Sequence, residues 1–271
     1  MAARLNMPAV YELSLPCQPR VLALLMRELL SDAPHLRRVN QLFGGDPILA
    51  AHLMACANAQ SYQMPAGVRG IPQAITLLGE RQLRALLQKA QAGLASRGTA
   101  GVDMAQFTRL SLDCAKLART LAVLSGLDAS AAYVAALLHG IGQILLHQSQ
   151  APGVAALDQE MAIWDPRRPR LELRTWGYSA STRTAALLRQ SNCPADMVAA
   201  MEAMDAPMAS EYFDPMAGVL HLAAWCSRAK HSGWSERSKA DAFPVDVALA
   251  LGIDVNVVLQ QEAPDWSQSL Y

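Results

Sequence analysis

The sequence has no excess of charge of either sign, and it is poor in charged residues altogether. Its 23 Lys and Arg residues balance its 23 Asp and Glu residues, and charged residues make up 17% of the 271 positions. Because proteins that bind nucleic acid carry clustered positive charge, this composition argues against a nucleic-acid partner. No apolar run approaches the roughly 20 residues of a membrane span, and the N-terminus lacks the apolar core of a signal peptide. We therefore expect a cytoplasmic protein with no membrane partner.

Cysteine and aromatic residues are also scarce. The five cysteines are scattered, odd in number and include no Cys-x-x-Cys pair, so we interpret them as small core residues in a reducing compartment rather than as metal ligands. Aromatic residues make up 6% of the chain and hydrophobic residues 52%, dominated by alanine and leucine. No convincing alternating strand pattern, internal repeat, Gly-x-Ser-x-Gly elbow or phosphate loop is present in the sequence. This composition predicts an all-α protein with a large core.

Apolar residues recur at helical spacing along most of the chain. The clearest helix is expected after Asp103, where an apolar stripe steps by three and four residues from Phe107 to Leu124. Three glycines between residues 93 and 101 mark the strongest break in the first half. We therefore divide the chain into an N-terminal helical subdomain at residues 1–100, with about five helices, and a larger helical subdomain at residues 101–271.

The segment from Tyr133 to Leu146 is the most distinctive in the chain. An apolar helix runs into His139 and Gly140, and a second apolar run follows. The segment resembles the Leu-Leu-His-Asp-Ile-Gly sequence of the HD superfamily of metal phosphohydrolases, with Gly140 in the place of the aspartate. A hard divalent cation needs anionic oxygen beside imidazole nitrogen, and the bound ion activates the attacking water. Since glycine supplies no side-chain atom, the resemblance implies an HD scaffold that has lost its catalytic centre.

A longer resemblance covers the chain from Leu15 to His231. Four fragments follow the order and spacing of the HDOD family, the HD-related output domain of bacterial signalling proteins. They are Leu15-Pro-x-x-Pro19, Gly45-Asp46-Pro47-Ile48-Leu49, Ala57-Asn58-Ala59-Gln60-Ser61-Tyr62 and Ile71-x-x-Ala74-Ile75-x-x-Leu78-Gly79. The resemblance implies an N-terminal helical bundle packed on a degenerate HD-like helical bundle. It also implies non-catalytic signal transduction through contacts with a protein partner.

The HD superfamily holds its metal with a histidine on one helix, the His-Asp pair on the next and a later aspartate. In this sequence the resemblance places those positions at Leu110, His139, Gly140 and Ala224. A single imidazole cannot chelate a metal, and open metal sites ordinarily keep three protein ligands. We therefore predict that the chain is not an enzyme and that it carries no cofactor.

Four residues are candidates for lining the cleft that a lost metal site would leave, which we call the relic cleft: His139, Gly140, Asp205 and His221. His139 either binds a ligand phosphate there or is a core histidine that bonds a backbone carbonyl at the helix end. We favour the core interpretation, and we do the same for His221. One alternative function is a sensor that binds a nucleotide such as cyclic di-GMP without hydrolysing it. The other is a residual metal phosphohydrolase that uses Glu202, Asp205 and His221.

Three further patterns each have two interpretations. Four methionines between Met197 and Met208 step at helical spacing and form either core, which we favour, or an adaptable partner surface. Residues 164–170 carry three arginines and form either a solvated loop, which we favour, or a contact for an acidic partner. Asn58 either shapes the connection between the halves or is a plain turn residue. We favour the turn, because asparagine accepts left-handed backbone geometry.

Overall fold

The computed structural model describes residues 15–59, 66–93, 99–149 and 153–254, and this part of the chain is helical. Within these ranges the only extended pairing is one isolated bridge between Thr99 and Val102. The predicted all-α class is therefore confirmed. In chain order the helices are α1 (Pro19–Leu29), α2 (Leu36–Gly44), α3 (Pro47–Ala57), α4 (Ile71–Gly93), α5 (Met104–Leu124), α6 (Ala129–Leu138), α7 (Ile141–Gln148), α8 (Val154–Glu160), α9 (Arg168–Trp176), α10 (Ala180–Gln190), α11 (Ala195–Ala203), α12 (Pro215–His231), α13 (Glu236–Ala242) and α14 (Val245–Ala250).

Aspartate side chains begin several of these helices, as the sequence indicates. The carboxylate of Asp46 accepts hydrogen bonds from two backbone N–H groups of the first turn of α3, each 2.9 Å long. Asp103 caps α5 and Asp128 caps α6 in the same way. A capping aspartate satisfies N–H groups that have no partner inside the helix, and its charge is favourable at that end of the helix dipole. These predicted helix starts are confirmed.

Helix α4 changes direction at Gly79, which has φ +67° and ψ 171°. The sequence predicts one helix that ends at Gly79 and another from Glu80 to about Ser96, and the backbone confirms the break. Glycine is required because a side chain at this left-handed φ would be strained. Ser96 itself lies outside the described residues.

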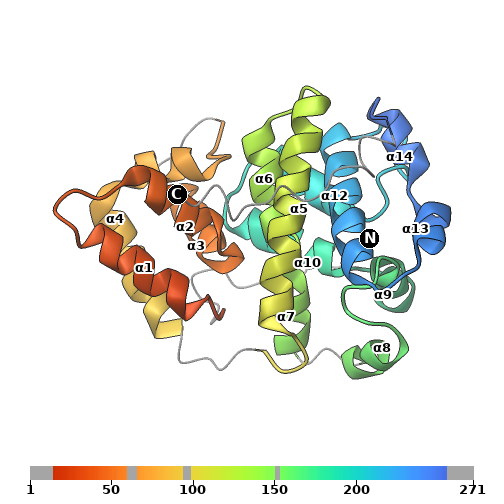
Figure 1. The fold of residues 1–271 in the computed structure, drawn as a ribbon, viewed down its shortest axis with the longest axis horizontal. Coiled ribbons are helices and arrows are strands. Elements are labelled where there is room, and N and C mark those ends of the chain that lie inside the picture. Colours follow the sequence, from red (N-terminus) through yellow and green to blue (C-terminus); the bar gives the residue numbers. More distant parts are fainter. Residues whose placement is uncertain (1–14, 60–65, 94–98, 150–152, 255–271) are drawn as a thin grey trace.

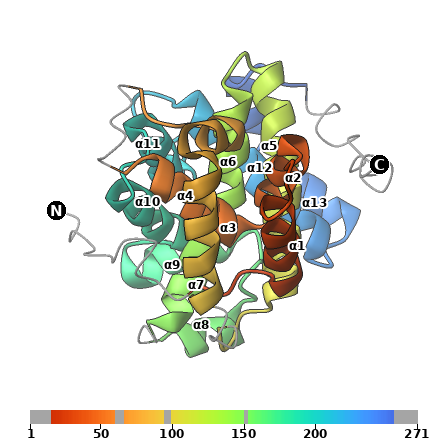
Figure 2. The ribbon, with the colours of Figure 1, turned by 90° about the vertical axis from the view of Figure 1, so that its left-hand side faces the viewer.

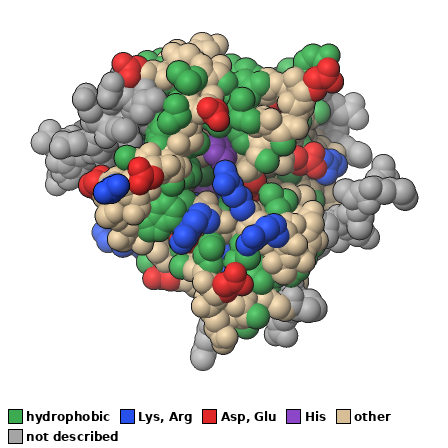
Figure 3. Space-filling view, turned by 90° about the vertical axis from the view of Figure 1, so that its right-hand side faces the viewer, with side chains coloured by type: hydrophobic (Ala, Val, Ile, Leu, Met, Phe, Trp, Pro, Cys, Tyr) green, Lys and Arg blue, Asp and Glu red, His purple; other side chains and the backbone are tan. Residues whose placement is uncertain are grey.

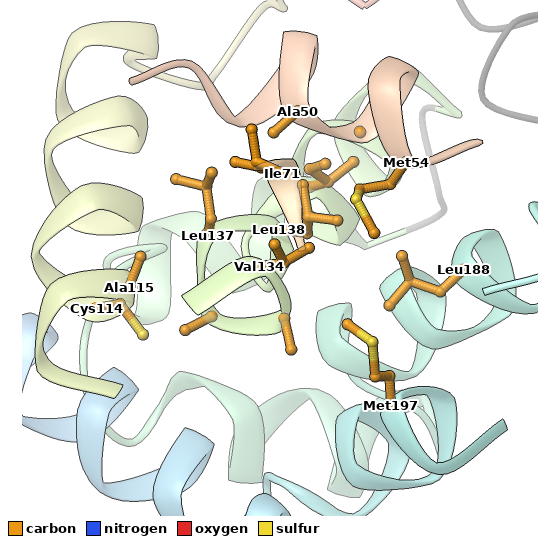
Figure 4. Packing of buried hydrophobic residues seen from close by; sticks show 14 of the residues in the cluster. Ala50, Met54, Ile71, Cys114, Ala115, Val134, Leu137, Leu138, Leu188 and Met197 are labelled. Carbon is orange, nitrogen blue, oxygen red and sulfur yellow. The ribbon is translucent and has the colours of Figure 1, made fainter. Parts of the chain in front are cut away.

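The helices form two lobes that share one hydrophobic core. Figure 1 shows the N-terminal lobe, α1–α4, on one side and the C-terminal lobe, α5–α14, on the other, and Figure 2 views the molecule from the N-terminal lobe. Figure 4 shows Ala50 and Met54 of α3 beside Val134, Leu137 and Leu138 of α6, and all five side chains are buried. Each large apolar side chain buried in this way contributes about 1.5–3 kcal/mol to stability.

Two polar contacts also join the lobes. The hydroxyl of Tyr133 on α6 donates a 2.9 Å hydrogen bond to the carbonyl of Gly44 on α2. Arg69, just before α4, pairs with Asp196 on α11 at 2.6 Å. The proposed boundary at residue 100 therefore divides a chain whose two parts are packed together, and residues 94–98 beside it lie outside the description.

Helices α6 and α7 form the centre of the C-terminal lobe. Together Ala129–Gln148 make a 20-residue stretch that is long and apolar enough to cross a membrane by length and composition, contrary to our expectation, but 83% of it is buried inside the fold. Neighbouring helices α3, α5, α10 and α12 pack against it. Its apolar character is therefore accounted for by its position in the core.

Close packing of α7 on α10 depends on Gly142. The backbone N–H of Gly142 donates a 2.9 Å hydrogen bond to Oγ1 of Thr184, and that hydroxyl donates to the carbonyl of His139 at 2.9 Å. A Cβ atom at residue 142 would overlap the carbonyl oxygen of Ala180. The second glycine of the central motif is thus needed for space.

A buried ionic network corrects the expectation of a solvated loop at residues 164–170. Arg168 is fully buried, with its Nε 3.0 Å from Oε1 of Glu172 and its Nη2 2.8 Å from Oδ1 of Asp158. Its Nη1 donates to the carbonyl of Met161 at 2.6 Å. The guanidinium therefore links α8 and α9 inside the protein, where an unpaired charge would be destabilising.

Asn58 corrects a second expectation. Its φ is −94°, so left-handed geometry does not explain this residue. Its side chain instead accepts from the N–H of Val68 at 2.7 Å and donates to the carbonyls of Val68 and Met54 at 3.0 and 3.1 Å. Asn58 therefore holds the loop before α4 against α3.

Three of the five cysteines, and three of the four methionines between Met197 and Met208, are buried. All five cysteines, each within the described residues, are free, and Cys17, Cys114 and Cys193 are buried. Met197, Met201 and Met204 are also buried, as favoured from the sequence, whereas Met208 is 50% exposed.

Candidate functional site

His139 lies at the end of α6 and is 2% exposed. Its Nδ1 is 2.6 Å from the carbonyl oxygen of Ala136. Burial and the nearby positive charge of Arg228 lower the pKa of His139 to about 3, against the raising effect of the bond to Ala136. The ring is therefore neutral near pH 7. Its Nδ1–H donates a hydrogen bond to the carbonyl oxygen of Ala136, and Nε2 is available as an acceptor. This is the environment expected of a core histidine.

Aromatic rings fill the space beside Gly140, the residue in the place of the HD aspartate. A Cβ at this residue would lie 3.1 Å from Cε2 of Phe107 and 3.5 Å from Cη2 of Trp164. Both aromatic side chains are buried, and their ring centroids are 6.2 Å apart. The backbone of Gly140, with φ −82° and ψ −6°, suits any residue. The missing carboxylate is thus replaced by apolar packing, and an aspartate would have no room without movement of Phe107.

The other two expected ligand positions are apolar and buried as well. Leu110 on α5 is 1% exposed and Ala224 on α12 is 5% exposed. The two helices pack together here, where the hydroxyl of Ser227 donates to the carbonyl of Leu110 at 3.0 Å. Across residues 15–254, leaving out the gaps in the description, no group of three or more His, Cys, Asp or Glu side chains could hold a metal ion. The residues present do not fit the metal site of the HD superfamily.

A positive charge lies among these positions instead. Arg228 on α12 is 4% exposed. His221, Ala224 and Arg228 are spaced by three and four residues, so they lie on one face of α12. The charge of Arg228 lowers the pKa of His139 at the end of α6, and of Cys114 on α5, where burial raises it more. The guanidinium is therefore buried and close enough to the end of α6 and to α5 for its charge to act on groups there.

His221 and Asp205 lie at the edge of this group. The Nδ1 of His221 is 2.7 Å from the carbonyl oxygen of Met204. Burial lowers the pKa of His221, with Arg170 and Arg228 acting in the same direction, while the bond to Met204 and the charge of Asp205 raise it. Asp205 accepts a hydrogen bond from the hydroxyl of Ser179. Of the four candidate residues, His139 and Gly140 are adjacent and buried, and the charge of Arg228 acts on both His139 and His221.

The surface above α9 and α12 is hollowed. Figure 3 faces the end of the molecule that carries α8, α9 and α12–α14, and it shows a histidine inside a depression with Lys or Arg side chains on one side of it. Two cavities lie elsewhere, along α5 between the lobes. One of about 630 Å³ is lined by Arg37, Lys116 and Arg119, and another of about 640 Å³ by Met104 and Arg109.

The trio suggested for a residual phosphohydrolase does not converge. Glu202 is exposed and pairs with Arg189 on α10 at 2.5 Å, whereas Asp205 and His221 make the separate contacts given above. Sequence reasoning also missed Arg228, although its spacing from Ala224 and His221 was a usable signal. Its burial could not be read from the sequence, because the C-terminal part of α12 carries Lys230 and His231 and looks solvated.

The family comparison matches residues 15–207 to the HDOD domain, most of the chain. This chain belongs to the HDOD family. No curated protein matches it. The fold of this HDOD protein is similar to solved structures of low sequence identity.

Three of these solved structures are informative about the fold. The MmoQ response regulator of Methylococcus capsulatus str. Bath has a TM-score of 0.70 at 19% identity, with 90% of this chain and 96% of that chain covered. A virulence factor of Campylobacter jejuni subsp. jejuni has a TM-score of 0.59 at 17% identity, with 93% and 98% covered. A protein of Shewanella amazonensis SB2B, named as a presumed phosphohydrolase, has a TM-score of 0.51 at 23% identity, with 92% and 89% covered.

Proposed function

We propose that this HDOD protein is a non-catalytic bacterial regulator that acts in signal transduction through contacts with other proteins. The observation that carries the proposal is the loss of the metal-binding side chains together with the filling of their space. Phe107 and Trp164 occupy the room beside Gly140, while Leu110 and Ala224 supply no ligand atom. The C-terminal lobe is thus a degenerate HD-like bundle. It works without a cofactor, in the cytoplasm, where free cysteines such as these remain reduced.

Exposed apolar side chains support the protein-contact part of the proposal. Leu30, 68% exposed, follows the end of α1, and Leu36, 66% exposed, is the first residue of α2. Val123 and Leu124, 65% and 53% exposed, lie together at the end of α5. Apolar residues that are grouped at the surface are typical of protein interaction sites.

Two measurements test the proposal. The first is the metal content and phosphoesterase activity of purified protein supplied with Mn²⁺, Fe²⁺ or Mg²⁺, with and without chelator. We expect no stoichiometric metal and no hydrolysis that the chelator abolishes, because the donor set is missing. Metal-dependent turnover of a nucleotide or another phosphoester would contradict the non-catalytic assignment.

The second measurement is affinity capture of partners by matched variants. We compare the wild type with the pair Leu30→Asp and Leu36→Asp, and with the pair Val123→Asp and Leu124→Asp. A partner that uses one of the two surfaces is lost with one pair and retained with the other. Capture that is indifferent to both pairs, or absent from the wild type, would contradict contacts through these surfaces.

A nucleotide sensor is the second candidate function. The observation that favours it is the buried Arg228, whose charge acts on both His139 and His221, since a phosphate group needs positive charge and N–H donors. A sensor of this kind, for cyclic di-GMP or another nucleotide, would bind its ligand without hydrolysis.

A further inference from the structure

Arg228 is buried on α12, one turn after Ala224, the position where the resemblance places the later aspartate of the metal site. It is on the face of α12 that carries Ala224, and its charge acts on His139 at the end of α6. The guanidinium of Arg228 therefore supplies one buried positive charge near His139.

This positive charge is not compensated by the protein. Among the residues that the structure describes, no hydrogen bond and no ion pair is made by Arg228, and its Nε is a buried donor without a partner. Arg168 shows how the same protein treats another buried guanidinium, with two carboxylates and a backbone carbonyl bound to it. An enclosed charge with unused donors destabilises a folded protein unless an anion accompanies it.

Further donors lie beside Arg228. Arg170 is exposed on α9, and both arginines act on His221. Asp205 is the one carboxylate whose charge affects the pKa of His221. It already accepts a hydrogen bond from the hydroxyl of Ser179. The face in Figure 3 has a histidine in a depression that is open to solvent, with basic side chains on one side of it. These side chains offer several N–H groups around one hollow.

We propose that Arg228, together with Arg170 and His221, binds a phosphoryl oxyanion in the relic cleft. Arginine N–H groups bind phosphate oxygens with directional, charge-assisted hydrogen bonds. The phosphoryl group belongs either to free phosphate or to a nucleotide, because both present the same oxygens to the guanidinium. This site rests on the nucleotide-sensor candidate of the proposed function and specifies its binding residues, whereas protein contacts through the surface leucines do not need it.

The test is isothermal titration of the purified protein with inorganic phosphate, at constant ionic strength against chloride. We expect saturable binding to the wild type, at least tenfold weaker binding to Arg228→Met, and severalfold weaker binding to Arg170→Gln. The control is Arg237→Gln, which removes a side chain that is 92% exposed on α13, and its affinity should equal that of the wild type. No binding to the wild type, or equal binding to Arg228→Met, would overturn the proposal.

Thermal unfolding shows whether Arg228→Met is folded and separates binding from stability. In chloride this variant should melt at or above the temperature of the wild type, because an unpaired buried charge has been removed. Phosphate should raise the melting temperature of the wild type and leave that of the variant unchanged. If Arg228→Met does not fold, the result for Arg170→Gln decides, and wild-type affinity in that variant would overturn the proposal.

Titrations with GMP and cyclic di-GMP identify the source of the phosphoryl group. Affinity at least tenfold above that for phosphate, lost in Arg228→Met, would show a nucleotide site, and equal affinity would show a phosphate site. These titrations contain no partner protein. Failure to capture a partner and failure to bind phosphate are therefore separate results.

Discussion

Replacing Gly142 by alanine should strongly destabilise this HDOD protein. The added Cβ would overlap the carbonyl oxygen of Ala180 and lie 2.6 Å from its carbonyl carbon and 2.9 Å from Oγ1 of Thr184. Since ordinary van der Waals contact begins at 3.4 Å, the backbones of α7 and α10 would have to separate by at least 0.8 Å. The obstacle is backbone, so no change of rotamer relieves it.

The loss can be estimated from three contributions. Overpacking that cannot relax costs about 3 kcal/mol. Separation of α7 from α10 also removes the two hydrogen bonds through the Thr184 hydroxyl, each about 1 kcal/mol. The lower backbone entropy of the unfolded alanine variant offsets about 0.5–1 kcal/mol. The free energy of unfolding should therefore fall by about 4 kcal/mol, which corresponds to roughly 8–16 °C in melting temperature.

Urea unfolding followed by circular dichroism measures this change. The matched control is Gly140→Ala, two residues earlier, whose Cβ would meet the ring of Phe107 at 3.1 Å. An aromatic ring can shift by a few tenths of an ångström, so we expect a loss of no more than about 2 kcal/mol. If Gly142→Ala were within about 1 kcal/mol of the wild type, or less destabilising than Gly140→Ala, the inferred contact between α7 and α10 would be wrong.

The remaining predictions concern buried polar groups. Arg168→Met should lower the free energy of unfolding by about 3–5 kcal/mol, because it leaves two carboxylates without their cation. The control is Arg167→Met, which removes an exposed ion pair. In the same urea titration this control should change the free energy of unfolding by no more than about 1 kcal/mol. Asn58→Ala should cost about 2–3 kcal/mol and speed amide exchange in the following loop, since three hydrogen bonds are lost; unchanged exchange there would contradict its role. The pKa values of His139 and His52 are lowered by burial to about 3 and about 4, below their value of about 6.5 in the unfolded chain. The unfolded state then binds more protons, so stability is full above about pH 6.5 and should fall by up to about 2.7 kcal/mol per pH unit as the pH drops toward 4. The slope should halve in His52→Gln, and a flat profile in the wild type would contradict the burial of these rings.

Local chemistry explains why so many helix starts could be predicted. Asp46, Asp103 and Asp128 each cap a helix through contacts two or three residues away, so the information lies within one turn of the chain. The break at Gly79 is local in the same sense, because a left-handed backbone conformation favours glycine. By contrast, helix α13 (Glu236–Ala242) was not predicted, since it has no fully buried residue and therefore no apolar stripe.

Part of the candidate site could likewise be predicted from the sequence, and part could not. The loss of the carboxylate is visible in the sequence at Gly140, because the residue type alone removes the ligand. The rings that fill the vacated space, Phe107 and Trp164, come from 33 residues before and 24 residues after it in the printed sequence. No local pattern could have paired them with Gly140. That no metal is bound and that the protein is not an enzyme remain predictions, which the proposed experiments test.

The sequence by itself determined the family, the helical class and the absence of the HD aspartate, because each depends on residue identity and near-neighbour spacing. Only the tertiary structure decided which arginines are buried. Arg168 and Arg167 are adjacent in the chain, yet one is enclosed among carboxylates and the other faces solvent. Arg228 is buried as well, but no such partners bind it in the part of the chain that the structure describes. Burial is set by which distant helices cover a side chain, and electrostatic energies depend on that burial far more than on residue type.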